Sequence, residues 1–180
     1  MTELCADKMQ NTPIILAPYS AEWPGMFTSE RAALSSLYPL HTFQIEHIGS
    51  TAVPGLAAKP LIDIMLGAPS LVEIEAQIEG LARLGYAYFR HHEKVMPYRR
   101  FFAKPEGHPR HFHLHAVVRG EKFWNEHLLF RDALRNNARL AEEYAALKLR
   151  LAAQFGTDRD GYTDAKTTFI TTAIRRAGGI

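Results

Sequence analysis

The stretch HIGSTAVPGLAAKPLIDIML, residues 47–66, contains two segments of different pattern, joined by a loop of small residues, glycine and proline. Residues 43–48 alternate between polar and apolar, which predicts a half-buried strand leading into Gly49. Residues 61–66 form an almost continuous apolar run, which is typical of a central strand. Asp63 is the one polar residue of that run. The stretch therefore predicts two strands, with a glycine turn after the first and a carboxylate inside the second.

The Gly49-Ser50-Thr51 turn and Asp63 together indicate phosphate and metal chemistry. A glycine lets a phosphate approach the backbone, while the serine hydroxyl and the amides of the turn can donate hydrogen bonds to it. Asp63 can then hold a cation against that phosphate. Taken alone, a Gly-Ser pair is most often only a turn. A carboxylate in an apolar strand must be paired, hydrogen-bonded or metal-bound, so a salt bridge to an arginine or lysine is the alternative for Asp63.

The remaining pattern predicts an α/β (α+β) protein whose strands precede a helical C-terminal part over 122–177. Ser20 and Ser70 are expected to cap two of the helices. The expected strands lie at 13–17, 86–89, 98–104 and 112–118, and the expected helices lie at 20–38, 70–84, 122–153 with a break near 136–137, and 162–176.

Length and composition indicate one folding unit over residues 1–180, with residues 1–12 as a loose tail. The formal net charge of +2 gives no strong electrostatic reason to expect binding to bulk nucleic acid or to an anionic membrane. Cys5 is the single cysteine and cannot form an internal disulfide, which favours a reducing compartment. The first dozen residues do not have the pattern of a signal peptide or membrane anchor. We therefore expect a cytoplasmic protein.

The segment His111-Phe112-His113-Leu114-His115 places alternate histidines on one face of a strand. Imidazole groups on one face can converge on a metal such as zinc or manganese. They can equally line a solvated or hydrogen-bonded sheet face, and the spacing does not decide between the two.

Several cationic side chains are candidates for contact with phosphate. Arg99 and Arg100 must point to opposite faces of their strand, so at most one of them faces a given site and can bind phosphate in a bidentate manner. Lys148 and Lys166 each follow a tyrosine at the i, i+4 spacing of one helix face, where aromatic packing beside a lysine is the alternative. Lys59 precedes the strand that carries Asp63.

Taken together, the segments HIGSTAVPGLAAKPLIDIML, RRFF, HFHLHAV, FRDALR, YAALKLRLA and YTDAKTTFI resemble the GrpB family, a group assigned to the nucleotidyltransferase superfamily related to DNA polymerase beta. The resemblance spans about residues 14–177. Ile48, Gly49, Ser50 and Asp63 match the superfamily signature residue by residue. The resemblance implies a nucleotidyltransferase-like mixed β-sheet flanked by helices, with a helical C-terminal part.

The resemblance also implies a function. A protein of this kind binds a nucleoside triphosphate with a divalent metal, Mg or Mn with Zn as a further option, and transfers a nucleotidyl group to an unknown small-molecule acceptor. The residues expected to bind the nucleotide are Gly49, Ser50, Thr51, Lys59, Arg99, Arg100, Lys148 and Lys166, and those expected to hold the metal and take part in catalysis are Asp63, His113 and His115.

One residue departs from the superfamily pattern, because Met65 stands where a second carboxylate is expected. Two-metal chemistry depends on clustered carboxylates, so the standard two-metal mechanism is in question. Glu46 is a candidate substitute, and Glu46, His113 and His115 are the candidate general bases. Two alternatives to nucleotidyl transfer stay open: a non-catalytic nucleotide- or small-molecule-binding protein on the same fold, and a metal-dependent phosphohydrolase. Whether the protein is an enzyme is left open.

Overall fold

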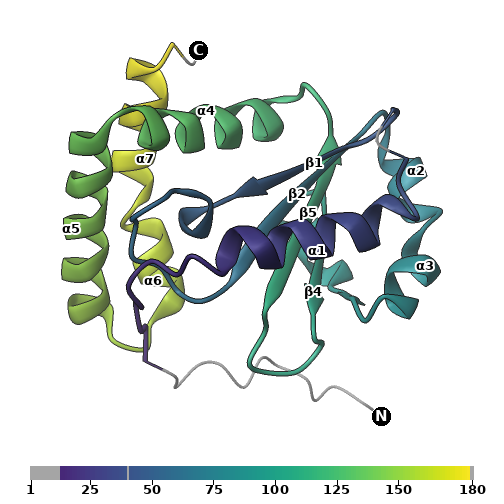
Figure 1. Cartoon of the computed structure of the whole chain (residues 1–180), viewed down its shortest axis with the longest axis horizontal. Coiled ribbons are helices and arrows are strands. Elements are labelled where there is room, and N and C mark those ends of the chain that lie inside the picture. Colours follow the sequence, from purple (N-terminus) through teal and green to yellow (C-terminus); the bar gives the residue numbers. More distant parts are fainter. Residues whose placement is uncertain (1–12, 40, 179–180) are drawn as a thin grey trace.

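The protein is described by a computed structural model that covers residues 13–39 and 41–178. A five-stranded sheet runs through its middle in the order β1-β2-β5-β4-β3 (Figure 1). β2 and β5 are parallel and the other pairs are antiparallel, which confirms the predicted mixed sheet. The strands are β1 (Gln44–Ile48), β2 (Ile62–Ala68), β3 (Ala87–Tyr88), β4 (Arg99–Lys104) and β5 (Phe112–Val118).

Helices flank the sheet on both sides. The first three come from the N-terminal half of the chain. Of the last four, the first runs along the top of Figure 1 and the other three lie on its left. The helices are α1 (Trp23–Ser35), α2 (Leu71–Glu75), α3 (Ile78–Arg83), α4 (Lys122–Asn136), α5 (Ala138–Phe155), α6 (Arg159–Asp164) and α7 (Thr167–Arg176), and two 3-10 turns are η1 (Ser50–Ala52) and η2 (Arg90–Lys94).

One face of the sheet is an apolar core. Alternate residues of β2 and β5 point to this face, where they meet α1, α2 and α3. The side chains at the centre of this core are almost completely excluded from water, which is the main source of stability in a fold of this kind. The core includes Leu34, Ile62, Ile64, Leu66, Ile74, Leu81, Leu114 and Ala116.

The opposite face carries the polar residues of β2 and β5 together with a smaller apolar cluster. Trp124 of α4 packs there against Met65 and Val117. Gly67 makes this contact feasible, because a Cβ atom at that position would lie 2.5 Å from the indole ring. α4 is thereby held close to β2 and β5 on the face that contains Asp63.

Three predicted elements are corrected at the N-terminal side. Residues 13–17 form no strand beyond an isolated bridge between Ala17 and Ala58, because Ile14 packs instead against Leu151 and Tyr162. The helix expected over 20–38 begins at Trp23 and ends at Ser35. The strand expected over 86–89 is reduced to β3, two residues long.

Two predicted helices are each divided in two. The helix expected over 70–84 breaks between α2 and α3, so that α2 lies against β2, β4 and β5 while α3 lies against β3. The helix expected over 162–176 breaks between α6 and α7, which leaves Lys166 at the junction.

The other elements are confirmed. β5 matches its predicted range and β4 begins one residue later than predicted, at Arg99. α4 and α5 separate at Asn137, whose side chain accepts a hydrogen bond from Leu140 N at 3.0 Å. Ser70 caps α2 as expected. The predicted tail over 1–12 lies outside the described residues.

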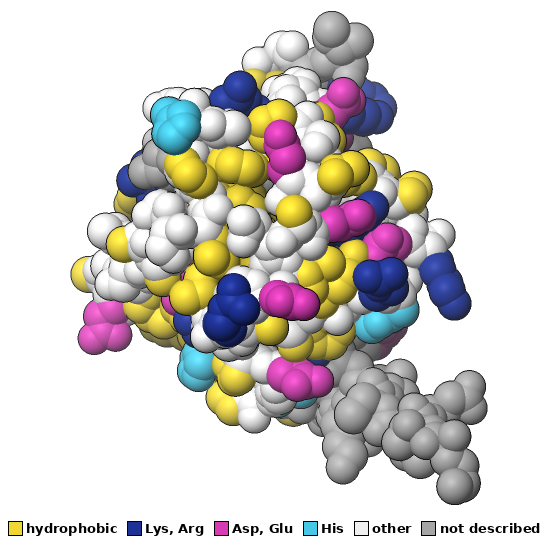
Figure 2. Space-filling model, turned by 90° about the vertical axis from the view of Figure 1, so that its right-hand side faces the viewer, with side chains coloured by type: hydrophobic (Ala, Val, Ile, Leu, Met, Phe, Trp, Pro, Cys, Tyr) yellow, Lys and Arg dark blue, Asp and Glu magenta, His cyan; other side chains and the backbone are white. Residues whose placement is uncertain are grey.

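Figure 2 shows the side of the molecule that bears α2 and α3, where acidic, basic and hydrophobic side chains are interspersed. Over the described residues, no helix has the length and apolar character needed to cross a membrane.

Candidate functional site

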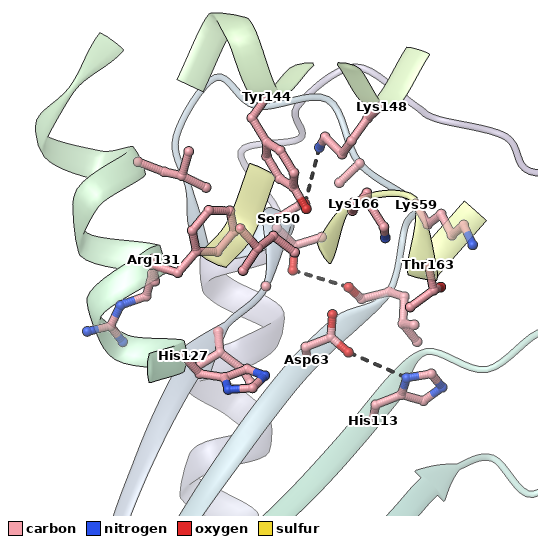
Figure 3. Close-up of a pocket in the computed structure, with 18 of the residues that line it drawn as sticks. Ser50, Lys59, Asp63, His113, His127, Arg131, Tyr144, Lys148, Thr163 and Lys166 are labelled. Carbon is pink, nitrogen blue, oxygen red and sulfur yellow. Dashed lines mark hydrogen bonds and ion pairs between the residues drawn. The ribbon is translucent and has the colours of Figure 1, made fainter. Parts of the chain in front are cut away.

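A pocket of about 490 Å³ opens between the polar face of the sheet and the C-terminal helices (Figure 3). Its walls come from η1 and the loop that follows it, from β2 and β5, and from α4 to α7. Most of the residues predicted for the site line this pocket: Gly49, Ser50, Thr51, Lys59, Asp63, His113, His115, Lys148 and Lys166.

Gly49 brings the backbone of the loop directly against Asp63. Its φ angle of 71° lies in the left-handed region, and a Cβ atom there would be 2.5 Å from Asp63 Oδ2. Ser50 follows at the start of η1, and its hydroxyl accepts a hydrogen bond from Lys148 Nζ at 3.1 Å. The loop thus joins the carboxylate of β2 to a lysine of α5.

Thr51 has a more internal role than the sequence predicted. Its hydroxyl donates to Leu61 O at 3.1 Å and lies 3.0 Å from His47 Nε2. The residue is only 2% exposed. The side chain therefore fixes η1 against β1 and the start of β2, and its hydroxyl is already engaged inside the protein.

Asp63, His113 and His115 come together at the floor of the pocket. The register of β2 and β5 sets Asp63 opposite His113, with both histidines on the same face. Asp63 Oδ1 lies 3.4 Å from His113 Nδ1 and 3.5 Å from His115 Nε2. Burial by itself raises the pKa of Asp63, but hydrogen bonding and charge from the two histidines hold that pKa well below its usual value. Among the described residues, the charged partners of Asp63 are therefore histidines, and not the arginine or lysine considered as an alternative.

These three side chains fit a divalent metal. One potential ligand atom from each lies within 4.8 Å of the other two, so small rotamer changes would let all three reach a common ion. Two imidazole nitrogens and one carboxylate form a mixed donor set, which suits zinc or another first-row transition metal better than magnesium. Their side chains are between 15% and 28% exposed, so the cluster is accessible from the pocket.

Three lysines face the same pocket at the end formed by α5, α6 and α7. Lys148 Nζ donates to Ser50 and to Ala57 O, and lies 5.0 Å from the centre of the Tyr144 ring. Lys59 Nζ and Lys166 Nζ lie 4.9 Å and 4.2 Å from the centre of the Tyr162 ring. Within the described part of the chain, no ion pair joins any of the three to a carboxylate.

The three lysine side chains are crowded and poorly hydrated, and their pKa values are lowered. Burial, with the nearby charge of Lys166, lowers the pKa of Lys148 to about 7. Burial, with the charges of Arg159 and Lys166, lowers the pKa of Lys59 to about 8. Burial also lowers the pKa of Lys166. An anionic ligand would relieve this repulsion, since it favours the charged form of each ammonium group.

The two predicted arginines do not line the pocket. Arg99 faces the polar side of the sheet but lies behind His115, with Nη1 3.1 Å from His115 Nδ1. Arg100 points to the opposite face, where Nε is 2.6 Å from Glu75 Oε1, and a second ion pair links it to Glu93. Because side chains alternate along β4, the two arginines lie on opposite faces, as expected. The prediction that Arg100 belongs to the site is corrected.

Met65 and Glu46 do not supply a second carboxylate. Met65 follows Asp63 on the same face of β2, but it is fully buried beneath Trp124. Glu46 does not line the pocket, and its Oε2 is 2.7 Å from Arg131 Nη1. Among the described residues, the groups that could share a metal ion with Asp63 are therefore the two histidines.

His127 is a pocket residue that the sequence pattern did not reveal. It lies on α4, close to Asp63 in Figure 3, and its Nδ1 donates to Phe123 O at 2.8 Å. Its Nε2 atom then carries a lone pair. Thr163, Arg131 and Tyr162 also line the pocket. A single histidine on a helix forms no repeating pattern in the sequence. Its position in the pocket depends on how α4 packs on the sheet, which the sequence pattern does not show.

The fold and pocket define a class: a mixed α/β protein in which an Asp-His-His cluster and a group of lysines share one cavity. A family model described as GrpB protein matches residues 13–176, and the chain belongs to the GrpB family. A crystal structure of the conserved protein GrpB from Enterococcus faecalis superposes with a TM-score of 0.79 and 32% identity, covering 91% of this chain and 96% of that one.

Curated relatives agree with this assignment. A UPF0157 protein of Pseudomonas aeruginosa is 38% identical over 91% of this chain and 67% of its own length. The glutamate-rich protein GrpB of Alkalihalophilus pseudofirmus is 34% identical, over 87% of this chain and 91% of its own length.

Some matches are to longer or more distant proteins. The chain spans 46% of a Bacillus subtilis UPF0157 protein at 35% identity, and 48% of a Mycolicibacterium paratuberculosis dephospho-CoA kinase at 27% identity. Terminal uridylyl transferase 4 from Trypanosoma brucei, with bound dUTP, matches with a TM-score of 0.49 and 13% identity over 88% of this chain and 54% of that one, too little to carry an argument about activity.

Proposed function

We propose that the protein binds a nucleoside triphosphate together with a divalent metal in this pocket, and transfers the nucleotidyl group to a small-molecule acceptor. The observation that carries the proposal is the presence, in one cavity, of an Asp-His-His cluster and of three lysines that form no ion pair with a carboxylate of the described residues. Clustered cations favour a ligand with several negative charges. The match of Ile48, Gly49, Ser50 and Asp63 to the nucleotidyltransferase signature supports the same proposal.

In this proposal the phosphate chain lies between the glycine loop and the lysines. Lys59, Lys148 and Lys166 neutralise charge on the phosphate oxygens, and the Gly49 turn lets the phosphate come close to the backbone. The ammonium group of Lys148 already donates a hydrogen bond to the Ser50 hydroxyl. A phosphate at this point therefore replaces the hydroxyl or shares the ammonium group with it. Arg99 and Arg100 take no direct part, because neither lines the pocket.

The metal would be held by Asp63, His113 and His115, and when bound it supplies positive charge and Lewis acidity for phosphoryl oxygens. In nucleotidyl transfer, a nucleophilic oxygen or nitrogen of the acceptor attacks the α-phosphorus, the bond to the β-phosphate breaks, and pyrophosphate leaves. The acceptor gives its proton to a base. Glu46 is unsuited to that role because it does not line the pocket and its carboxylate is paired with Arg131.

The buried position of Met65 favours a second candidate function, nucleotide binding without turnover. A site with one carboxylate can hold one ion, whereas two-metal transfer needs a bridge between two. A metal-dependent phosphohydrolase that uses the histidine strand is the third candidate, which the Asp-His-His donor set favours. The products distinguish these candidates: pyrophosphate from transfer, inorganic phosphate from hydrolysis, and neither from binding alone.

The experiment is a thermal-stability screen of metal-stripped protein against nucleoside triphosphates, each with and without Mg, Mn or Zn. A ligand at a hundredfold excess over its Kd stabilises the folded state by about 2.7 kcal/mol, which is readily measured. Dephospho-CoA and ATP belong in the panel because a dephospho-CoA kinase is among the similar proteins.

The proposal expects a shift that needs both nucleotide and metal. Lys148→Met should reduce that shift, while Lys122→Met, on an exposed lysine outside the pocket, should leave it unchanged. A shift with metal alone and with no nucleotide would contradict the triphosphate site.

A further inference from the structure

The buried guanidinium of Arg99 has unusual partners. The residue is 8% exposed, yet no carboxylate of the described residues forms an ion pair with it. Its Nη1 lies 3.1 Å from His115 Nδ1 and its Nη2 lies 3.5 Å from His92 Nδ1. The guanidinium carbon lies 5.1 Å and 5.9 Å from the ring centres of Phe101 and Phe123. Arg99 is thus held by aromatic rings and presents its N–H groups to histidines.

This contact determines which nitrogen of His115 carries the proton. A guanidinium group donates hydrogen bonds and has no acceptor, and it stays protonated at neutral pH. His115 Nδ1 must therefore be the acceptor, and in the neutral ring the proton lies on Nε2. That Nε2 atom lies 3.5 Å from Asp63 Oδ1, which can accept from it.

The same arrangement is opposed to metal binding through His115. A neutral imidazole binds a metal through a nitrogen lone pair, and the other nitrogen usually donates its N–H to a carboxylate, a carbonyl or water. In His115 the nitrogen that faces Asp63 carries the proton, and the other nitrogen faces a donor. A metal on Nε2 therefore requires His115 to change tautomer and to lose its hydrogen bond from Arg99.

His127 provides the opposite case in the same pocket. Its Nδ1 donates to Phe123 O, so its Nε2 carries the lone pair, as in a metal-ligating histidine. Both rings stack on Phe123, with ring centres 3.8 Å apart for His127 and 6.1 Å apart for His115. The pocket therefore contains histidines that are preset in opposite tautomers by their outer partners.

We propose that Arg99 is a positioning residue that holds His115 in the Nε2–H tautomer and thereby weakens metal binding at the Asp63-His113-His115 cluster. Metal binding breaks the Arg99–His115 hydrogen bond and moves the ring proton to Nδ1. The effect on affinity rests on the metal site of the proposed function, whereas the tautomer of His115 in metal-free protein does not. Partners of this outer kind commonly change metal affinity by about 10- to 100-fold.

The first test is a long-range proton–nitrogen NMR spectrum of the metal-free full chain labelled with nitrogen-15 histidine. His115→Gln and His127→Gln assign the two rings among the nine histidines. We expect His115 to be protonated on Nε2 and His127 on Nδ1, so that one spectrum contains both patterns. A His115 ring protonated on Nδ1 in metal-free protein would overturn the proposal.

The second test measures zinc affinity by calorimetry for the wild type, Arg99→Gln and Arg99→Lys. Glutamine can accept from His115 Nδ1–H, so Arg99→Gln should bind zinc at least about tenfold more tightly. Lysine keeps a charged donor and should stay close to the wild type. Equal affinities in all three would contradict the effect on metal binding. Absence of zinc binding in all three would contradict the metal site itself, and the metal-free tautomer would still decide the role of Arg99.

Discussion

The two faces of the central strands β2 and β5 differ sharply although the same segments form both. On one face Ile64 and Leu66 are completely buried against α1 and α2. On the other face Asp63 and His113 are partly exposed and approach each other at the floor of a pocket. Because successive side chains alternate across a strand, one sequence can serve stability on one face and chemistry on the other. The two roles should therefore be separable by mutation.

The largest expected effect is on the apolar face. Leu66→Ala removes buried methyl groups and should lower the free energy of unfolding by about 2–5 kcal/mol. The residues of the pocket are on the opposite face, so metal affinity at the Asp63 cluster should remain within about twofold of the wild type. Urea unfolding and zinc calorimetry test both statements. A parallel loss of metal affinity in the folded variant would show that the two faces are coupled.

A substitution on the polar face should instead change metal affinity and leave the protein folded. Asp63→Asn removes the carboxylate of the metal cluster and should weaken zinc binding by about a hundredfold, about 2.7 kcal/mol, while the protein remains folded. Glu142→Gln, on an exposed carboxylate away from the pocket, is the control and should have no effect. Retained zinc affinity would mean that the histidines bind metal elsewhere or without Asp63, and an unfolded variant would assign Asp63 a structural role.

At the lysine end of the pocket, the stability of the folded protein should depend on pH. The pKa of Lys148 is about 7 in the folded protein, below the usual lysine value. Between these two values the unfolded chain binds more protons than the folded one, so the stability of ligand-free protein should rise with pH above about 7.

Binding of a triphosphate reverses this proton balance. The anion favours charged Lys148, so binding takes up a proton above pH 7 and affinity should fall by up to about tenfold per pH unit. Calorimetry in buffers with different ionisation enthalpies measures this uptake. Lys148→Met should lose most of it, and an unchanged uptake would assign the proton to another group.

The smallest expected effect concerns the contact between the loop and Asp63. Gly49 and Gly55 both have φ angles in the left-handed region, but only at Gly49 would a Cβ atom meet another group, Asp63 Oδ2 at 2.5 Å. Both alanine variants carry backbone strain, and Gly49→Ala adds the clash with Asp63 to it. We expect Gly49→Ala to be less stable than Gly55→Ala by about 1 kcal/mol or more, as measured by chemical unfolding. Equal stabilities would show that the loop can move away from Asp63.

Much of the fold could be predicted because its signals are local. The apolar run with one carboxylate predicted β2, and the alternating histidines predicted β5. The resemblance then indicated a mixed sheet with a helical C-terminal part. Residues 13–17 were misassigned because Ile14 packs against helices, and an apolar pattern does not state what it packs against.

The site residues could be predicted where side chains alternate along a strand or where a motif has a fixed spacing. Asp63, His113 and His115 meet because adjacent strands are in register, whereas sequence could not choose between Arg99 and Arg100. His127 could not be found, since its position depends on how Trp124 docks α4 near Gly67. The outer contact of Arg99 with His115 depends on side-chain geometry across two strands.

The proposed function requires metal and triphosphate to bind together in one pocket. Calorimetric titration of a nucleoside triphosphate into zinc-loaded and metal-stripped protein, with Asp63→Asn in parallel, measures whether they do. We expect the zinc-loaded wild type to bind the triphosphate at least about tenfold more tightly than the stripped protein, a difference of about 1.4 kcal/mol, and Asp63→Asn to abolish this difference. Equal affinities with and without metal, or a difference that persists in Asp63→Asn, would contradict the proposed function.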